Sequence, residues 1–257
     1  MSKKTQPIAV FDSGVGGISV LRELVKILPQ EDYIYYGDSK NAPYGMKDKA
    51  QVQQLTIDAA EYLFAQGAKG LVVACNTATS AGVRVLREMY PDIPIVGIEP
   101  AVKPASQFKP GGRVLVMATP MTIREEKFQK LMAKYQEDAQ ILPLPCPGLM
   151  DFVERGDLTS ADFRKYLEEL LYEYRIHPVD AAVLGCTHYP FAKEMIQEIL
   201  GKDVVIFDGG EGTAREMKRR LGEADLLSPS TEQGKVIFQN SLENEKKIKL
   251  CEQLLHL

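Results

Sequence analysis

Two cysteines stand where thiol chemistry is possible. One lies in Cys75-Asn-Thr77 and the other in Cys186-Thr-His188, and each follows a short apolar run. Backbone N–H groups at the start of a helix favour an anion and can lower the pKa of a thiol. Without such help a thiol is mostly protonated near neutral pH, because its reference pKa is about 8.5. Either thiol could therefore serve as a base or as a nucleophile.

One histidine is placed to assist a thiol. The chain has three, and His177, which precedes a proline, indicates a surface turn, while His256 lies in the tail. Only His188 follows an expected strand beside a cysteine. It could hold or shuttle a proton for Cys186, because imidazole titrates near neutral pH.

Two other kinds of cysteine site are disfavoured. Cys186-x-His188 is not a zinc-finger spacing, and the chain has no C-x₂₋₄-C pair, so we predict no metal. A Cys–His hydrolase needs only one such cysteine, and a second one in an equivalent setting argues against it. Cys146, between two prolines, and Cys251, near the end of the chain, are interpreted as structural.

A glycine-rich turn, Asp12-Ser-Gly-Val-Gly-Gly17, follows the first apolar run. The dinucleotide fingerprint requires G-x-G-x-x-G, but Ser19 stands where the third glycine belongs, and the G-K-[ST] of a phosphate loop is absent. We therefore favour a tight strand-to-helix turn that presents Asp12 and Ser13 to a ligand over a nucleotide site.

Short apolar runs alternate with amphipathic stretches along the chain. The expected strands are residues 8–11, 33–36, 71–74, 95–98, 113–117, 181–184 and 204–207, with a weaker one at 140–144. The expected helices are residues 18–28, 48–66, 80–89, 123–135, 161–174, 191–200 and 211–221. Most strands are apolar on both faces, as strands covered by helices on both sides are. This alternation predicts an α/β fold with doubly wound parallel sheets.

Breaker-rich segments predict two domains. Prolines and glycines concentrate in 99–112 and again at 208–210. We predict a first domain of residues 1–99 plus 209–257 and a second of residues 100–208. The tail is expected to return to the first domain with an edge strand at 235–238 and a charged helix from about Leu242.

The two halves of the chain contain an internal echo. Leu71–Ala78 matches Ala182–His188, and Ile8–Gly14 resembles Arg113–Pro120. All βα units share some likeness, but a cysteine at the same point of each unit favours duplication. Ligands of open parallel sheets bind outside the carboxyl ends of the strands. We therefore expect two pseudo-symmetric domains with the active site in the cleft between them, where two thiols could invert one carbon as acid and base.

Composition excludes several classes of protein. The 257 residues are 45% hydrophobic and 26% charged, which is typical of globular proteins. With 31 basic and 35 acidic residues and no basic run longer than a few residues, binding to nucleic acid or to an anionic membrane is disfavoured. No apolar run approaches a membrane span, and the N-terminus does not resemble a signal peptide. We expect a soluble, cytoplasmic protein.

Four segments together resemble the cofactor-independent amino acid racemases of the aspartate/glutamate family. They are Val10–Gly17, Tyr36–Gly45, Val73–Thr79 and Leu184–Pro190, which span most of residues 7–210. The Cys-Thr-His-Tyr-Pro run favours the glutamate branch over the aspartate branch.

The resemblance implies interconversion of L- and D-glutamate, with no pyridoxal phosphate and no metal, to supply D-glutamate for bacterial peptidoglycan. It also implies a homodimer. Cys75 and Cys186 match the catalytic thiols, which serve D- and L-glutamate respectively, and Asp12 and His188 match the groups that assist them. The implied substrate-binding positions are Asp12, Ser13, Pro43, Tyr44, Gly45, Asn76, Thr77, Thr119, Thr122, Glu154, Thr187 and His188.

Other functions remain open at this point. Racemisation of another acidic amino acid, such as aspartate, would use the same thiols. An amino acid binding module also has two α/β domains, but the paired thiols weigh against it. A nucleotide-binding regulatory domain is disfavoured by the incomplete glycine fingerprint.

Overall fold

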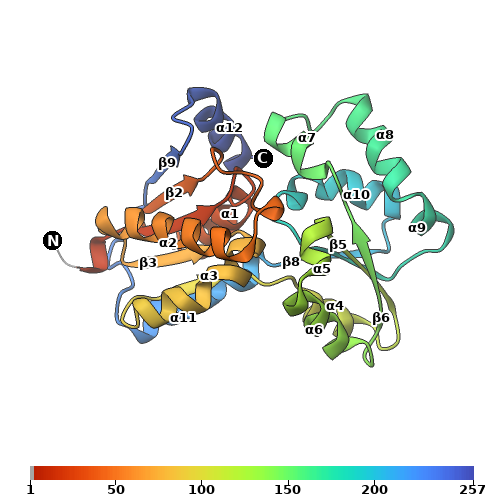
Figure 1. Ribbon diagram of the computed structural model, residues 1–257, viewed down its shortest axis with the longest axis horizontal. Helices are drawn as coiled ribbons and strands as arrows, with labels where there is room; N and C mark the ends of the chain where they lie inside the picture. The colour runs from red at the N-terminus through yellow and green to blue at the C-terminus, as the bar shows by residue number, and fades with distance from the viewer. Residues whose placement is uncertain (1–2) are drawn as a thin grey trace. The chain divides into compact units, whose positions relative to one another are not determined.

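The computed structural model describes residues 3–257, except for the side chain of Lys127, and the chain forms two compact units (Figure 1). Unit 1 contains the residues up to Glu99 together with Gly210–Leu257, and unit 2 is Pro100–Gly209. Each unit has one parallel sheet covered by helices on both faces. The predicted α/β class with two doubly wound parallel sheets is confirmed.

Unit 1 is built on a five-stranded sheet in the order β4-β3-β1-β2-β9, in which every pair is parallel. The strands are β1 (Ile8–Asp12), β2 (Tyr33–Gly37), β3 (Gly70–Val73), β4 (Ile95–Gly97) and β9 (Val236–Asn240). The helices are α1 (Ile18–Ile27), α2 (Lys49–Ala65), α3 (Asn76–Met89), α11 (Gly210–Glu223) and α12 (Glu245–Leu255).

The two faces of this sheet have separate coverings. Ala9, Phe11, Leu71 and Val73 pack in one cluster with buried residues of α2 and α3. On the opposite face, α1 packs against α11 and α12. Because side chains alternate along a strand, buried strands of this kind need apolar residues at every position.

Unit 2 has a four-stranded parallel sheet in the order β6-β5-β7-β8. Its strands are β5 (Arg113–Ala118), β6 (Gln140–Pro145), β7 (Ala181–Leu184) and β8 (Val205–Asp208). Its helices are α4 (Val102–Phe108), α5 (Pro120–Arg124), α6 (Glu126–Tyr135), α7 (Leu149–Arg155), α8 (Ala161–Leu170), α9 (Tyr172–Ile176) and α10 (Lys193–Leu200). One face packs against α7, α8 and α10, and the other packs against α4 and α6.

The two sheets share one connectivity. In unit 1 the first strand, β1, lies between β3 and β2, with β4 beyond β3. In unit 2 the first strand, β5, lies between β7 and β6, with β8 beyond β7. The pseudo-symmetry predicted from the internal echo is therefore present in the topology, and β9 is the strand without a counterpart.

Several helix boundaries differ from those expected. Helix α3 begins at Asn76 rather than at residue 80, because Cys75 caps it. The helix expected over 123–135 is two helices, since Glu125 has an extended backbone with φ −68° and ψ 135°. The helix expected over 161–174 is interrupted at Leu171 and continues as α9. Helices α4 and α7 were not predicted, because each is only seven residues long.

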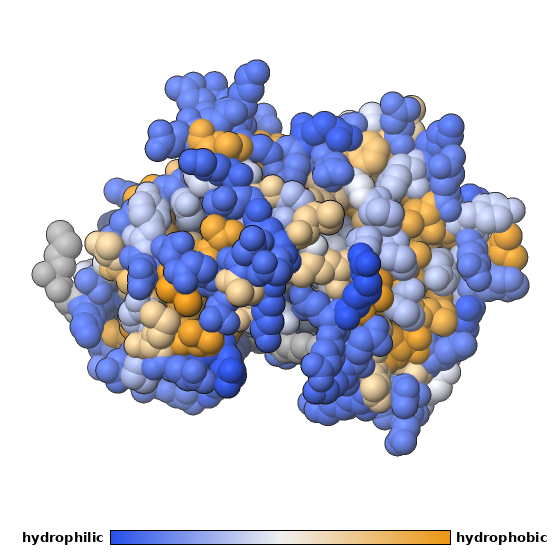
Figure 2. Space-filling model, viewed as in Figure 1, coloured by the Kyte–Doolittle hydropathy of each residue, from blue (hydrophilic) through white to orange (hydrophobic). Residues whose placement is uncertain are grey.

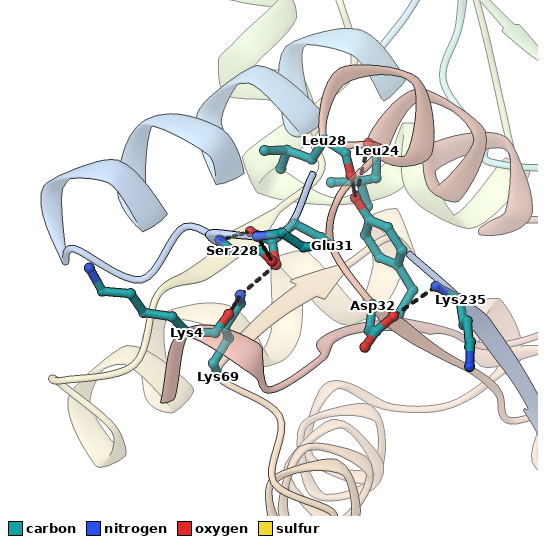
Figure 3. Close-up of polar contacts among 10 residues, drawn as sticks. Lys4, Leu24, Leu28, Glu31, Asp32, Lys69, Ser228 and Lys235 are labelled. Atoms are coloured by element: carbon teal, nitrogen blue, oxygen red, sulfur yellow. Dashed lines mark hydrogen bonds and ion pairs between the residues drawn. The ribbon is translucent and has the colours of Figure 1, made fainter. Parts of the chain in front are cut away.

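A buried ion pair connects the segment between α11 and β9 to the N-terminal part of unit 1 (Figure 3). Lys69 pairs with Glu31, and both side chains are almost fully buried. The second carboxylate oxygen of Glu31 accepts a hydrogen bond from the backbone N–H of Ser228 at 2.8 Å, and Lys69 also donates to the carbonyl of Lys4 at 2.6 Å. The pair therefore holds four chain segments together before β9 enters the sheet.

The surface is mostly hydrophilic on the face shown in Figure 2, with apolar residues in small patches between charged ones. Among residues 3–257, no helix combines the length and the apolar character that crossing a bilayer requires.

Candidate active site

The first predicted thiol lies at the start of a long helix in unit 1. Cys75 follows β3 by two residues, is 6% exposed, and occupies the N-cap position of α3. Its sulfur accepts a hydrogen bond from the backbone N–H of Ala78 at 3.5 Å. The N-terminus of a 14-residue helix carries partial positive charge, which stabilises negative charge on this sulfur.

The glycine turn after β1 brings a second polar group to this thiol. The hydroxyl of Ser13 lies 3.5 Å from the sulfur of Cys75, from a position 62 residues earlier. Asp12 is fully buried at the end of β1, and its Oδ1 accepts a hydrogen bond from the backbone N–H of Gly14 at 2.8 Å. A Cβ at Gly17 would lie 2.6 Å from that of Asp12, so only glycine fits there. The turn thus fixes Asp12 and Ser13 at the edge of the sheet that carries Cys75.

Tyr44 is buried and lies in the segment that connects β2 to α2. Its hydroxyl donates a hydrogen bond of 2.7 Å to Oδ2 of Asp38, a residue with 3% exposure. Burial raises the pKa of Tyr44, and the hydrogen bond and the charge of Asp38 raise it further, so the phenol stays protonated. Of the neighbouring predicted binding residues, Pro43 is exposed and Gly45 is half-buried.

Asn76 has a buried oxygen that is not satisfied. Its side-chain Oδ1 has no hydrogen-bond partner among the described residues. Buried polar atoms are nearly always bonded, so this oxygen, next to Cys75, is available to accept a further hydrogen bond. Thr77, the next residue, is buried as well.

The second predicted thiol belongs to a chain of polar contacts within unit 2. The sulfur of Cys186 lies 3.6 Å from Nδ1 of His188, and Nε2 of His188 donates to Oε1 of Glu154 at 2.8 Å. Burial of His188 opposes protonation, but the hydrogen bonds to Cys186 and Glu154 prevail and raise its pKa well above its usual value. The imidazole therefore lies between a carboxylate and a thiol, in an environment that favours its protonated form.

The remaining predicted residues of unit 2 lie at the same sheet edge. The Thr119 hydroxyl caps α5, accepting from the backbone N–H of Thr122 at 3.2 Å, and the two hydroxyls lie 2.9 Å apart. Thr187 is buried beside Cys186. Cys146, interpreted as structural, is buried at the end of β6, and burial raises the pKa of its thiol.

Corresponding backbone contacts position the two thiols. The N–H of Ala74, just before Cys75, donates to the carbonyl of Phe11 in β1 at 2.8 Å. The N–H of Gly185, just before Cys186, donates to the carbonyl of Met117 in β5 at 2.7 Å. At each cysteine the chain therefore leaves the sheet in the same way, beside the first strand of its unit.

The structure brings the predicted residues together in two groups, one in each unit. Asp12, Ser13 and Cys75 converge in unit 1, and Glu154, His188 and Cys186 converge in unit 2. Asp38, the partner of Tyr44, was not among the predicted site residues. Its position directly after β2, where polar side chains gather, was the signal that could have identified it.

Metal-binding geometry is not found in this arrangement. Within the described part of the chain, no group of three or more His, Cys, Asp or Glu side chains is placed to hold a metal ion.

Comparisons with known proteins all identify racemases as similar to this chain. Residues 8–217 match the family model described as Asp/Glu/Hydantoin racemase. The chain is 51% identical over 257 residues to a glutamate racemase from Clostridium acetobutylicum, covering all of both chains. It is 51% identical over 254 residues to the one from Clostridium perfringens (strain ATCC 13124), covering 99% of this chain and 98% of that one.

A solved structure of a glutamate racemase is also similar to this chain. The glutamate racemase of Francisella tularensis, in complex with D-glutamate, superposes with a TM-score of 0.83 at 29% identity and covers 99% of this chain and 95% of its own. The matching family model covers most of the chain, and the curated relatives match it from end to end. The chain is therefore an isomerase that belongs to the Asp/Glu/hydantoin racemase family.

Proposed function

We propose that this protein interconverts L- and D-glutamate without a cofactor, using Cys75 and Cys186 as its two proton-transfer groups. The observation that carries the proposal is the equivalence of the two thiols. Each follows the corresponding strand of a pseudo-symmetric sheet, and each has its own polar assistant. The relatives named glutamate racemase support glutamate as the substrate.

The reaction needs a base on one face of the α-carbon and an acid on the other. In the direction from D-glutamate, the thiolate of Cys75 removes the α-proton, and the thiol of Cys186 delivers its own proton to the opposite face. The product is L-glutamate, with Cys75 protonated and Cys186 left as the thiolate. The reverse direction exchanges the two roles, which explains why chemically matched groups serve this reaction.

The assisting residues follow from the contacts within each unit. Asp12 and Ser13 would assist Cys75, and His188, held by Glu154, would supply or accept the proton of Cys186. The orphaned Oδ1 of Asn76 can accept a hydrogen bond from the ammonium group of the substrate. The hydroxyls of Thr77, Thr119, Thr122 and Thr187 are suited to bind its carboxylates.

The first test follows both the inversion of the α-carbon and the exchange of its proton with solvent. Purified protein is incubated with L-glutamate in D₂O with no cofactor added, and optical rotation and loss of the α-proton signal are recorded together. Two-base racemisation predicts loss of rotation with deuterium at the α-carbon. Exchange without inversion would show that only one base acts, and the absence of both signals would refute the proposed activity.

The second test distinguishes the two proposed catalytic cysteines from the other cysteines. Cys75→Ala and Cys186→Ala should each abolish racemisation, whereas Cys251→Ala, on α12, should retain it. A rate near that of the wild type in either of the first two variants contradicts the mechanism. A parallel assay with aspartate tests the alternative of a different acidic substrate.

The cellular role and the assembly are part of the same proposal. We expect the protein to supply D-glutamate for peptidoglycan in a bacterial cytoplasm and to act as a homodimer. Expression of the chain should restore growth of a D-glutamate auxotroph without added D-glutamate, whereas the Cys75→Ala variant should not. Sedimentation velocity should give the mass of two chains.

A further inference from the structure

A polar cavity lies in unit 1, apart from the predicted substrate-binding residues. It has a volume of about 850 Å³ and is lined by residues from the end of β2, from α2, and from β9 and α12. That volume is within the range of small-molecule sites. None of the residues proposed to bind glutamate lines it. The lining residues used below are Tyr36, Asp38, Asp58, Tyr62, Glu245 and Glu252.

The cavity has an excess of negative charge. Its lining contains five carboxylates, Glu243 among them, and two lysines, Lys40 and Lys249. Within the described part of the chain, none of these seven residues forms an ion pair. The potential inside the cavity therefore favours a cation over an anion.

Asp38 is the deepest of these carboxylates and differs from the rest. It is only 3% exposed, and its partners are the neutral hydroxyl of Tyr44 and the neutral amide of Asn41, at 2.7 Å and 3.0 Å. A buried carboxylate is costly unless a positive charge accompanies it. Since Asp38 lines the cavity, a bound cation can provide the charge that the chain does not supply.

Two aromatic rings complete the recognition surface. The ring centroids of Tyr36 and Tyr62 are 5.2 Å apart and the rings are tilted by 47°, and both line the cavity. Aromatic faces attract organic cations and pack against their methylene groups. A hydrated inorganic ion would gain much less from such a surface, so the lining favours an organic cation.

From these observations we infer that the cavity is a binding site for a small organic amine, an alkyl chain with one or two ammonium groups. One ammonium group lies against Asp38 and the two rings, and the carboxylates of α2 and α12 surround the remainder of the ligand. The inference concerns binding at a separate site, so it stands whether or not the proposed racemase activity is confirmed.

The contacts of Asp38 predict that a ligand bound there also affects the segment that contains Tyr44. Its carboxylate accepts the hydrogen bond of Tyr44, and its backbone N–H donates to the carbonyl of Asp12 at 2.9 Å. An ammonium group on Asp38 competes with the Tyr44 hydroxyl for the same oxygens. This part of the inference rests on the proposed function, because Tyr44 is a proposed substrate-binding residue.

The test uses two probes that differ only in charge. Putrescine carries an ammonium group at each end of a four-carbon chain, and 1,4-butanediol has the same chain with neutral hydroxyls. Titration calorimetry on the full chain should show saturable binding of putrescine and none of butanediol. The affinity should fall as salt is raised, because screening weakens the attraction. Equal binding of the two probes, or no binding of putrescine, overturns the inference.

Variants locate the site. Asp38→Asn should weaken putrescine binding at least tenfold, and Asp58→Asn and Tyr62→Leu, at exposed positions of α2, should each weaken it severalfold. Glu61→Gln is the matched control, since this exposed carboxylate lies on α2 outside the cavity lining. Unchanged affinity in Asp58→Asn and Tyr62→Leu would refute the site even if Asp38→Asn failed to fold.

A separate measurement tests whether binding in the cavity affects the binding of glutamate. Saturating putrescine should raise the KM for glutamate in the wild-type chain and have no such effect in Tyr44→Phe, which has already lost the hydrogen bond. If putrescine binds with the predicted variant pattern but leaves KM unchanged, the binding site stands and the coupling is refuted.

Discussion

The carboxylate of Glu154 lies 2.8 Å from Nε2 of His188, although the two residues are 34 positions apart. The other ring nitrogen, Nδ1, lies 3.6 Å from the sulfur of Cys186. Carboxylate, imidazole and thiol thus form a continuous chain of contacts within unit 2. This arrangement orients the imidazole and favours its protonated form, as a carboxylate partner does for a histidine in many proton-transfer sites.

Replacing Glu154 by glutamine should lower the pKa of His188. The amide can keep a hydrogen bond to the ring, but it removes the negative charge that helps to hold the pKa above its usual value. NMR titration of the His188 ring, assigned with His188→Asn, should show a lower midpoint, and the corresponding limb of the pH–rate profile should move to lower pH. Glu198→Gln, which removes a surface partner of Arg164, should leave the midpoint in place.

The same shift predicts a dependence of stability on pH. The pKa of His188 is higher in the folded chain than the unfolded value of about 6.5, so protonation favours the folded state. This contribution is complete below the unfolded value and is lost as the pH rises through the folded one. The free energy of unfolding of the wild-type chain minus that of His188→Asn should therefore decrease as the pH rises. A constant difference would contradict the predicted shift.

Ser13→Ala should slow proton transfer at Cys75. The variant removes the hydroxyl that lies 3.5 Å from the sulfur, and a hydrogen bond to a charged group contributes about 1.5–3 kcal/mol, or roughly 10- to 150-fold in rate. Because Cys75 is proposed to act on D-glutamate, the primary isotope effect with α-deuterated D-glutamate should increase more than that with the L-isomer. Ser19→Ala, on α1, serves as the control, and equal changes for both isomers would count against the assignment.

Gly17→Ala should destabilise unit 1 and reduce activity. The added Cβ would lie 2.6 Å from the Cβ of Asp12 and 3.1 Å from that of Ala74, inside a packed region. Overpacking of this kind costs about 1–3 kcal/mol, and the strain displaces Asp12. Gly212→Ala is the matched control, because a Cβ there meets no atom within 4 Å and alanine suits a helix. Urea unfolding and the racemase assay would test both variants.

Lys69→Met should be strongly destabilising, because it leaves the Glu31 carboxylate buried without its cation. Removal of one partner of a buried pair costs about 3–5 kcal/mol, whereas replacement of both partners by apolar residues can be close to neutral. The double variant Glu31→Leu with Lys69→Met should therefore recover part of the loss. Lys26→Met, which breaks a surface contact with Glu23, should change the free energy of unfolding by less than about 1 kcal/mol. A double variant less stable than Lys69→Met would contradict this account.

Local sequence patterns predicted the elements that carry the two thiols. Buried parallel strands need continuous apolar runs, and these runs are visible in β1, β3, β5 and β7 without any tertiary information. Each cysteine follows its strand, β3 or β7, by two residues, so its place at a sheet edge depends only on neighbouring residues. The internal echo also predicted the pseudo-symmetry, because corresponding strands have corresponding sequences.

Helix boundaries were less predictable, because they depend on single capping contacts. The sulfur of Cys75 caps α3, and periodicity alone placed the start of this helix four residues later. The break at Glu125 divides a stretch whose apolar periodicity continues through it.

Contacts between distant residues were decided by the tertiary structure alone. The pairing of β9 with β2, the contact of Glu154 with His188, and the bond between Tyr44 and Asp38 depend on how separate elements pack. Glu154 lies on α7, a helix too short to produce a periodic signal. The sequence by itself thus determined the strands, the two thiols and their likeness, because these are local properties of the chain. The contact of Ser13 with Cys75, the contact of Glu154 with His188 and the cavity beside Asp38 were decided only by folding, because these contacts and cavity walls join residues that no local pattern relates.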